Sequence, residues 1–283
     1  MSLQKRVSQQ PTEDKGDTVQ KVQFQHKKLT AAEVRSNHLH RLHRLHRVKL
    51  FSAAICHITQ GSKVIIQEEN RVVATPDELI IVPANTSLEI INQPVHGQFH
   101  SDLLVLSPDL LTEFKSQYVR DFPAARPASV CAPLSHDLAF MWDNLLHAVR
   151  HDLPEKLQKH QAMGLLLALL EEGVAGPLLI ERRYSLTEQV RQIVMLSPAK
   201  NWSVQEIAGQ LAIGESTLRR RLKDESQSYR LIVEEVRMSL ALSQLQSTTL
   251  PIGEIASRCG YLSGSRFTAR FREHYGCLPK TVR

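Results

Sequence analysis

Several signals that would assign this sequence to a particular class of protein are missing. No apolar run reaches membrane-spanning length, and the longest candidate, residues 163–170, is followed by Glu171 and Glu172. The first residues, MSLQKRVSQQPTEDKGD, contain no apolar signal core. The four cysteines lie far apart without a C-x-x-C pair, which disfavours a disulfide framework or a zinc site. These absences predict a cytoplasmic protein without a membrane partner.

Motifs of the common enzyme classes are also absent. There is no phosphate-cradling glycine loop, no G-x-S-x-G elbow and no H-E-x-x-H. Histidines recur in residues 38–47, but arginines alternate with them and oppose a metal cation, so we interpret this tract as a solvated basic segment. His96 and His100 lie four apart, unlike the histidines one residue apart of metal-binding cupins. We therefore expect no enzyme, metal or cofactor, with a cupin-type metalloenzyme as the remote alternative.

Positive charge is concentrated at the end of the chain. Residues 1–180 contain 19 Lys+Arg and 19 Asp+Glu, whereas residues 181–283 contain 16 basic and 10 acidic residues. A basic domain beside a neutral one favours a polyanionic partner for the basic half. Chance variation of surface charge is the competing interpretation at this point.

The remaining pattern divides the first part of the chain into an arm and a domain. Residues 1–30 are polar and lack periodicity, which predicts a disordered arm. Short apolar runs separated by turn residues predict that residues 48–106 form a small, cupin-like β-barrel. Helical patterns follow within residues 107–176. The expected fold is α+β, with residues 31–178 a regulatory or dimerisation domain and residues 181–283 an all-α DNA-binding domain.

A helix-turn-helix is predicted within WSVQEIAGQLAIGESTLRRRLK, residues 202–223. Ser203 and Glu206 have the spacing of a capping box at the start of the first helix. Gly214 is expected to supply the flexible backbone of the turn. In the second helix, residues 215–223, the polar side chains expected to face outward are Ser216, Arg219, Arg220 and Lys223. The arginine fork suits the O6 and N7 acceptors of guanine, although a solvated basic helix end is the alternative.

The architecture recurs in LPIGEIASRCGYLSGSRFTARFREH, residues 250–274. The pair Ile255-Ala256 follows Ile207-Ala208 by 48 residues, which indicates a repeated unit. Ser263 is expected to cap the second helix, residues 264–274. The arginines available on its outer side are Arg266, Arg270 and Arg272.

One continuous helix, residues 229–246, is predicted between the two units. Its 18 residues span roughly 27 Å. With the units' own widths added, that length can hold two recognition helices about one DNA turn apart, near 34 Å. A single chain is therefore predicted to read two successive major grooves of double-stranded DNA.

Three ordered motifs now carry a family resemblance. The first is I-A-x-x-L-x-I-x-x-S-T-L-x-R-x-L-K, at residues 207–223, and the second is Arg237-Met238 with Ala241. The third, at residues 255–279, is I-A-x-x-x-G-Y-x-S-x-S-x-F-x-x-x-F-R followed by Y-G-x-x-P. About the last third of the chain thus resembles the DNA-binding domain of AraC/XylS regulators, with some similarity to the virulence and acid-resistance regulators of enteric bacteria.

The resemblance implies a sequence-specific transcription regulator, and an activator in preference to a repressor or a nucleoid-type DNA binder. It implies base contacts from Ser216, Arg219 and Arg220 in the first unit, and from Gly264, Ser265 and Thr268 in the second. Because Gly264 has no side chain and Ala269 replaces a common arginine, we expect the second unit to contribute mainly phosphate contacts. The full set of predicted DNA-binding residues is Ser216, Thr217, Arg219, Arg220, Lys223, Gly264, Ser265, Arg266, Thr268, Arg270 and Arg272.

The resemblance also implies RNA polymerase as a partner and a nucleoid-associated location. For the regulatory domain two roles stay open. Helices within residues 135–176 are expected to mediate homodimerisation, and the mouth of the barrel could bind a small-molecule effector.

Overall fold

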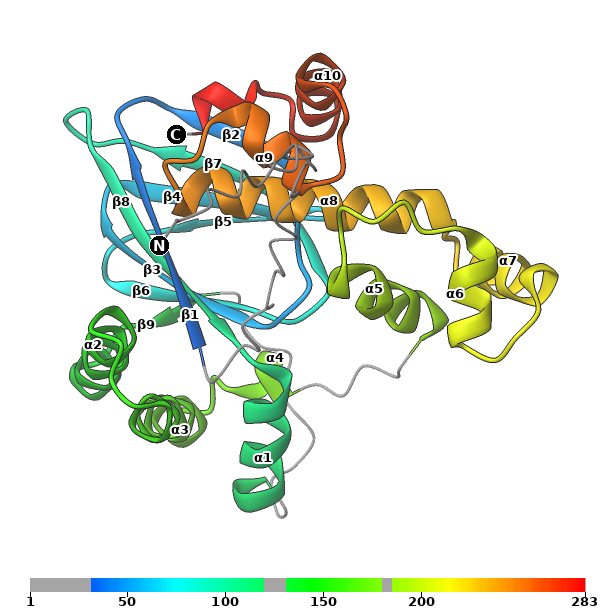
Figure 1. Ribbon diagram of the computed structural model, residues 1–283. Helices are drawn as coiled ribbons and strands as arrows, with labels where there is room; N and C mark the ends of the chain where they lie inside the picture. Colours follow the sequence, from blue (N-terminus) through cyan, green and yellow to red (C-terminus); the bar gives the residue numbers. More distant parts are fainter. Residues whose placement is uncertain (1–31, 120–130, 180–184, 283) are drawn as a thin grey trace, which may run out of the picture.

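The computed structural model describes residues 32–119, 131–179 and 185–282. Strands come first along the chain and helices follow (Figure 1). The strands are β1 (Ala32–Leu39), β2 (His43–Leu50), β3 (Ala54–Gln60), β4 (Ser62–Gln67), β5 (Asn70–Ala74), β6 (Glu78–Val82), β7 (Thr86–Gln93), β8 (Phe99–Leu106) and β9 (Cys131–Pro133). The predicted arm, residues 1–30, lies outside the described residues.

Helices cover one side of the strands and then form the second half of the chain. The first group is α1 (Pro108–Tyr118), α2 (His136–Arg150), α3 (Glu155–Glu171) and α4 (Gly176–Leu179). The second group is α5 (Leu186–Leu196), α6 (Val204–Gln210), α7 (Glu215–Asp224), α8 (Tyr229–Ser247), α9 (Ile252–Arg258), α10 (Gly264–Tyr275) and the 3₁₀ turn η1 (Pro279–Thr281). Within the described ranges, none of these helices has the length and apolar character needed to cross a membrane.

The strands form two antiparallel sheets that face each other. Sheet A has the order β1-β8-β3-β6-β9 and sheet B the order β2-β7-β4-β5. The predicted α+β architecture is confirmed, but the sheets do not close into a barrel, because β1 pairs with β8 and β2 with β7 rather than with each other. Helix α8 contacts both of these edge strands and lies across the opening between them.

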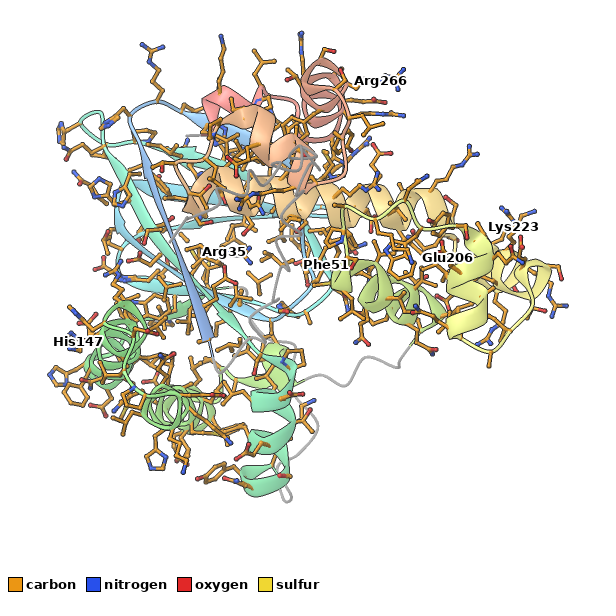
Figure 2. The ribbon with its side chains drawn as sticks, in the orientation of Figure 1. Arg35, Phe51, His147, Glu206, Lys223 and Arg266 are labelled. Atoms are coloured by element: carbon orange, nitrogen blue, oxygen red, sulfur yellow. The ribbon has the colours of Figure 1, made fainter. Side chains whose placement is uncertain are left out.

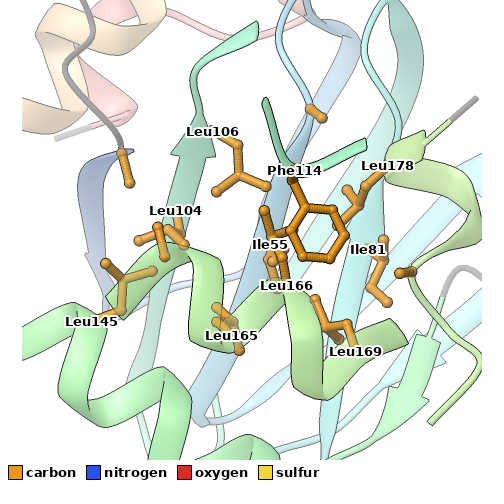
Figure 3. Packing of buried hydrophobic residues seen from close by; sticks show 14 of the residues in the cluster. Ile55, Ile81, Leu104, Leu106, Phe114, Leu145, Leu165, Leu166, Leu169 and Leu178 are labelled. Carbon is orange, nitrogen blue, oxygen red and sulfur yellow. The ribbon is translucent and has the colours of Figure 1, made fainter. Parts of the chain in front are cut away.

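Sheet A is buried on both of its faces, which explains the continuous apolar runs of its strands. In β6, Leu79 and Ile81 pack against the helices, while Ile80 and Val82 face sheet B. Figure 3 shows the side toward the helices, where Phe114 of α1 lies among leucines of α3 and side chains of the sheet. Sheet A is thus the middle layer between sheet B and α1–α4.

Residues 38–39 and 43–47 belong to β1 and β2, and residues 40–42 connect them. The arginines of this tract, Arg41, Arg44 and Arg47, are exposed, so its basic side chains face solvent although the tract is part of the sheets. Alternate side chains of β2 point inward: His43 and Leu45 are buried, whereas Arg44 is exposed. The sequence does contain the strand pattern, in which inward and outward side chains alternate every two residues, but the many histidines and arginines make it hard to recognise. The strands accordingly begin at Ala32, well before the predicted range of residues 48–106.

The helical half packs directly against sheet B. Leu45 and Val48 of β2 belong to the same buried cluster as Leu242 of α8 and Phe271 of α10. Beside this cluster, Nζ of Lys49 lies 3.1 Å from a carboxylate oxygen of Glu235. Apolar packing and a half-buried ion pair therefore fix α8 against the strands.

We predict that Phe114→Ala lowers the free energy of unfolding of the N-terminal half by about 3–5 kcal/mol, because it leaves a large cavity in a closed core. The control is Leu42→Ala between β1 and β2, since Leu42 is 65% exposed. Chemical denaturation followed by circular dichroism measures both variants. Equal losses would contradict the assignment of Phe114 to the core.

Candidate nucleic-acid interface

The first helix-turn-helix unit consists of α6, a short turn and α7. Ser203 caps α6 by accepting a hydrogen bond from the N–H of Glu206 at 3.1 Å, and the Glu206 carboxylate accepts the N–H of Ser203 at 2.8 Å. This is the predicted capping box. Hydrogen bonds from Lys200 and then from Ser203 lower the pKa of Glu206 to about 2. The carboxylate therefore stays ionised and holds the start of the unit in place.

The turn of this unit differs in one respect from the expectation. Its positive φ, +52°, belongs to Ala212. Gly214 has an extended backbone with φ of −75° and serves as the N-cap of α7. The N–H of Ile213 donates to the carbonyl of Ala208 at 3.0 Å and closes the turn. The left-handed residue is one that the sequence did not mark, since alanine rarely adopts this conformation.

Helix α7 has one buried and one exposed side. Leu218 and Leu222 are buried. The predicted outward residues Ser216, Arg219, Arg220 and Lys223 are exposed, and Thr217 is half-buried. Since the exposed four are spaced three and four apart, they share one helix face. Figure 2 shows Lys223 on the outside of this unit, away from the sheets.

The second unit consists of α9, a turn and α10. The turn uses Gly260 with φ of +80°, and Ser263 caps α10 as predicted. Phe267, Phe271 and Tyr275 lie on the buried side of α10. Their rings form a series with centroids 5.7 Å and 4.7 Å apart, which fixes the helix on the domain core.

The predicted DNA-binding residues of α10 fall on two sides of the helix. By helical spacing, Ser265, Thr268 and Arg272 share one face, while Arg266 and Arg270 lie on a flank. All of these are exposed except Thr268, which is half-buried. Gly264 is exposed as well. The structure therefore brings only part of the predicted set together on one surface of this unit.

Acidic neighbours engage Arg270, which sequence reasoning treated as available. Its guanidinium lies 2.8 Å from a carboxylate oxygen of Glu273 and 3.9 Å from one of Glu234. Glu273 is one helix turn away, a spacing at which opposite charges pair on a helix. Contact with a phosphate would have to compete with both carboxylates.

Sequence comparisons bear on this half of the chain. A family model described as a helix-turn-helix domain matches residues 207–283. The HTH-type transcriptional regulator YdeO of Escherichia coli K12 is 37% identical over 98 residues, covering 35% of this chain and 38% of YdeO. The chain carries an AraC/XylS-type helix-turn-helix domain.

Other relatives match over somewhat longer segments than the AraC/XylS-type domain alone. The urease operon transcriptional activator of Escherichia coli is 30% identical over 129 residues, covering 45% of this chain and 44% of that protein. The virulence regulon transcriptional activator VirF of Shigella flexneri is 28% identical over 131 residues, or 46% of this chain and 50% of VirF. The matched segment thus spans half or less of each of these relatives.

Solved structures match the fold of both halves. ToxT from Vibrio cholerae strain SCE256, in a crystal structure with bound unsaturated fatty acid, has a TM-score of 0.66 at 15% identity, covering 88% of this chain and 94% of ToxT. ToxT from strain O395 with bound (E)-4-(8-methylnaphthalen-1-yl)but-3-enoic acid has a TM-score of 0.67 at 13% identity, covering 89% and 100%. At such identities the likeness establishes the arrangement of sheets and helices alone.

A narrow cavity of about 60 Å³ lies where the AraC/XylS-type domain meets the sheets. Strands of both sheets line it, β1, β3, β6 and β8 of sheet A and β2, β4 and β7 of sheet B, together with Ser239, Leu242, Ser243 and Gln246 of α8. The lining side chains from the sheets are mostly aliphatic. The predicted effector site was the mouth of a barrel; in the structure α8 forms one wall of the cavity, a contact that the sequence pattern does not reveal.

Buried polar groups stand at one end of this cavity. Lys63 of β4 is 6% exposed and Asn92 of β7, its cross-strand neighbour, is 2% exposed. Nζ of Lys63 lies 3.5 Å from Sγ of Cys56 and from Oγ of Ser101. No carboxylate among the described residues pairs with it, and Oδ1 of Asn92 has no hydrogen-bond partner there. Such a cation is unusual, since buried charges are normally paired.

No three histidine, cysteine, aspartate or glutamate side chains gather as a metal-binding group in the described parts of the chain. His96 and His100 do not converge with a third such residue. Two histidines lie where β2 meets the last part of the helical half: Nε2 of His43 on β2 is 3.7 Å from Sγ of Cys277, and His274 of α10 interacts with Arg47 of β2.

Burial lowers the pKa of both His43 and His274 below the ordinary value of 6.5. Glu234 and Glu235 oppose the shift at His274 and Arg47 adds to it. Released or unfolded histidines bind protons near pH 6.5, whereas the docked ones do so only at lower pH. The docked state is therefore fully stable above about pH 6.5 and loses stability as pH falls below it.

We predict that the midpoint of thermal unfolding falls between pH 7.5 and pH 5.5, and that His43→Gln/His274→Gln removes part of this fall. The control is His136→Gln on α2, since the side chain of His136 is 96% exposed. Differential scanning calorimetry across that range gives the readout. The same pH slope in wild type and double variant would rule out these two histidines as its source.

Proposed function

We propose that this protein is a sequence-specific transcription activator that reads two successive major grooves of a promoter with α7 and α10. One observation carries the proposal: both recognition helices expose polar and basic faces and are fixed on the shared helix α8. The proposed DNA contacts are those predicted from the sequence. Base contacts come mainly from Ser216, Arg219 and Arg220, and α10 adds mainly phosphate contacts.

The named relatives support a regulator in preference to an enzyme. They are transcriptional regulators, and two of them are described as activators. We assign the chain no catalytic activity and place it with the nucleoid in the cytoplasm. A repressor or nucleoid-type binder of the same fold is the alternative, and transcription from a reporter promoter with and without the protein distinguishes them.

The first test is selection of genomic fragments that the full-length protein binds at physiological salt. A site with two short motifs about one helical turn apart supports the two-groove mechanism. Fragments recovered without a common motif favour the nucleoid-type alternative. Absence of binding at low salt overturns the proposed function.

We predict that Arg219→Ala weakens binding to the selected site by about 1–3 kcal/mol and relaxes base preference in one half-site. The control is Arg221→Ala, which removes the same charge from an exposed position on another side of α7. Fluorescence anisotropy at several salt concentrations separates the two effects, because loss of a phosphate contact alone lowers the salt slope without changing preference. Unchanged preference in Arg219→Ala would remove that residue from the base-reading set.

We further propose RNA polymerase as the partner in activation and a homodimer formed through the helical layer of the first half. The dimer is supported by apolar side chains without cover on that layer, since Phe140 of α2 is 59% exposed and Leu157 of α3 is 49% exposed. Analytical ultracentrifugation of Phe140→Ser and Leu157→Ser tests it. A wild type that sediments as a monomer at micromolar concentration contradicts it.

We also propose an effector, a small carboxylic acid with an apolar body, which binds in the cavity between the sheets and α8. Lys63 would receive the carboxylate and Asn92 would orient beside it, while the aliphatic lining buries the rest. The unpaired buried ammonium supports this choice of charge, because an anion removes the cost of burying it. The two ToxT structures hold ligands of this chemical kind.

We predict that octanoate raises the thermal unfolding midpoint of the wild-type protein more than 1-octanol does, because Lys63 favours the carboxylate. Lys63→Met keeps most of the buried aliphatic stem and abolishes this preference. Lys156→Met on α3, at an exposed position, serves as the control. Equal responses to acid and alcohol in the wild type would refute the assignment of Lys63.

A further inference from the structure

The turn of the second helix-turn-helix unit presents one leucine fully to solvent. The relative exposure of Leu262 is 105%, the highest among the large apolar side chains of the described residues. It lies directly before Ser263, the N-cap of α10. Single exposed leucines are common on proteins, so exposure alone does not indicate a binding role. The position of Leu262 in the repeat and the residues around it do indicate one.

Leu262 is an additional residue relative to the first unit. Up to the end of the turn the units correspond at a spacing of 48: the N–H of Ile213 donates to Ala208 at 3.0 Å, and that of Tyr261 donates to Ala256 at 2.9 Å. In the first unit the N-cap follows Ile213 immediately. In the second unit the N-cap comes one residue later, and Leu262 occupies the extra position.

Both neighbours of Leu262 hold the chain in place. The Tyr261 ring packs edge-on against Phe267, with centroids 5.5 Å apart. On the other side, Oγ of Ser263 accepts the N–H of Arg266 at 3.5 Å and lies 2.7 Å from Oγ of Ser265. A leucine between two anchored residues has a defined direction at little cost in backbone entropy.

Arg237 of α8 lies beside the preceding part of this turn, with its guanidinium carbon 6.0 Å from the ring centroid of Tyr261. Its guanidinium donates to the carbonyls of Pro198 at 3.0 Å and Lys200 at 3.1 Å. A Cβ at Gly260 would lie 2.9 Å from that guanidinium. The turn is therefore pressed against α8 and presents Leu262 on the side away from the core.

At the start of α10, Gly264 leaves room for DNA to approach Leu262 closely. Gly264 has no side chain, and its Cβ position has no heavy atom within 4 Å. In helix-turn-helix proteins the N-terminal residues of the recognition helix approach the base edges. The apolar group exposed on base edges in the major groove is the C5-methyl of thymine.

We propose that Leu262 reads a thymine methyl group in the half-site bound by the second unit. The inference rests on the proposed DNA-binding function and deepens it, since it gives base recognition to a unit otherwise expected to contact mainly phosphates. Gly264 permits the close approach, and Leu262 gains apolar contact only where thymine is present.

Deoxyuridine, which lacks the methyl group and pairs like thymine, provides the test. Each thymine of the second half-site of the selected DNA is replaced singly, and dissociation constants are measured for wild type and Leu262→Ala. At one position the wild type should lose about fourfold in affinity, the effect of one buried methyl group. Leu262→Ala should bind the thymine and deoxyuridine sites equally well.

Two controls separate this contact from general effects. Leu231→Ala removes another leucine of the helical half, 42% exposed on α8, and should retain the wild-type response. Arg219→Ala should bind more weakly yet keep the ratio between thymine and deoxyuridine sites. Circular dichroism should show Leu262→Ala folded, because its side chain packs against nothing.

Every outcome decides between the two proposals. If the wild type binds its site but no deoxyuridine in the second half-site matters, or if Leu262→Ala responds as the wild type does, the role of Leu262 is refuted and the proposed function stands. If the wild type selects no DNA sequence, the proposed function itself fails and this inference fails with it.

Discussion

Helix α8 is the element on which the helical half depends, because its buried side chains belong to two separate cores. Ile232 and Val236, near its start, pack in the core of the first helix-turn-helix unit. Leu242 and Leu245, near its end, pack in the core of the second unit. A straight helix of this length is stiff, so packing of each unit on α8 fixes the distance and rotation between α7 and α10. Two-groove recognition requires this fixed relation.

The same helix also carries the contact with the sheets. Glu235 lies between two cations: its carboxylate is 3.1 Å from Nζ of Lys49 on β2 and 3.5 Å from a guanidinium nitrogen of Arg191 on α5. The Arg191 side chain is only 3% exposed and stacks over the ring of Phe51, 4.9 Å from its centroid. Loss of Glu235 would leave Lys49 without its carboxylate partner and Arg191 with Glu188 alone, which is costly where solvent is excluded. The contacts of Glu235 with Lys49 and Arg191 therefore make the packing of α8 against the sheets specific as well as favourable.

Local patterns predicted most of the helical half. The capping box at Ser203 and Glu206, the cap at Ser263 and the spacing of buried Leu218 and Leu222 all depend on residues close together in the sequence. Such interactions can be read without knowing the tertiary structure. For the same reason, the predicted long helix between the units agrees closely with α8.

Contacts between distant segments were the part that the sequence could not supply. His43 on β2 contacts Cys277, more than two hundred residues later, and the pairing of Arg270 with Glu234 depends on the packing of α10 on α8. The cavity was missed for a related reason, since one wall comes from α8. Lys63 gave a weak signal, a charged residue at the inward position of an apolar strand, which alternation alone can detect.

The position of the cavity joins the two proposed binding events through one side chain. Leu242 lines the cavity and also belongs to the buried cluster that includes Phe271 of α10. An acid held at Lys63 would therefore occupy a cavity whose wall includes a residue that packs with α10. Since closely packed cores have few alternative arrangements, a change in the contacts of Leu242 alters the support of α10. Any resulting effect of the acid on DNA affinity must be matched by an equal effect of DNA on affinity for the acid, because binding free energies are linked reciprocally.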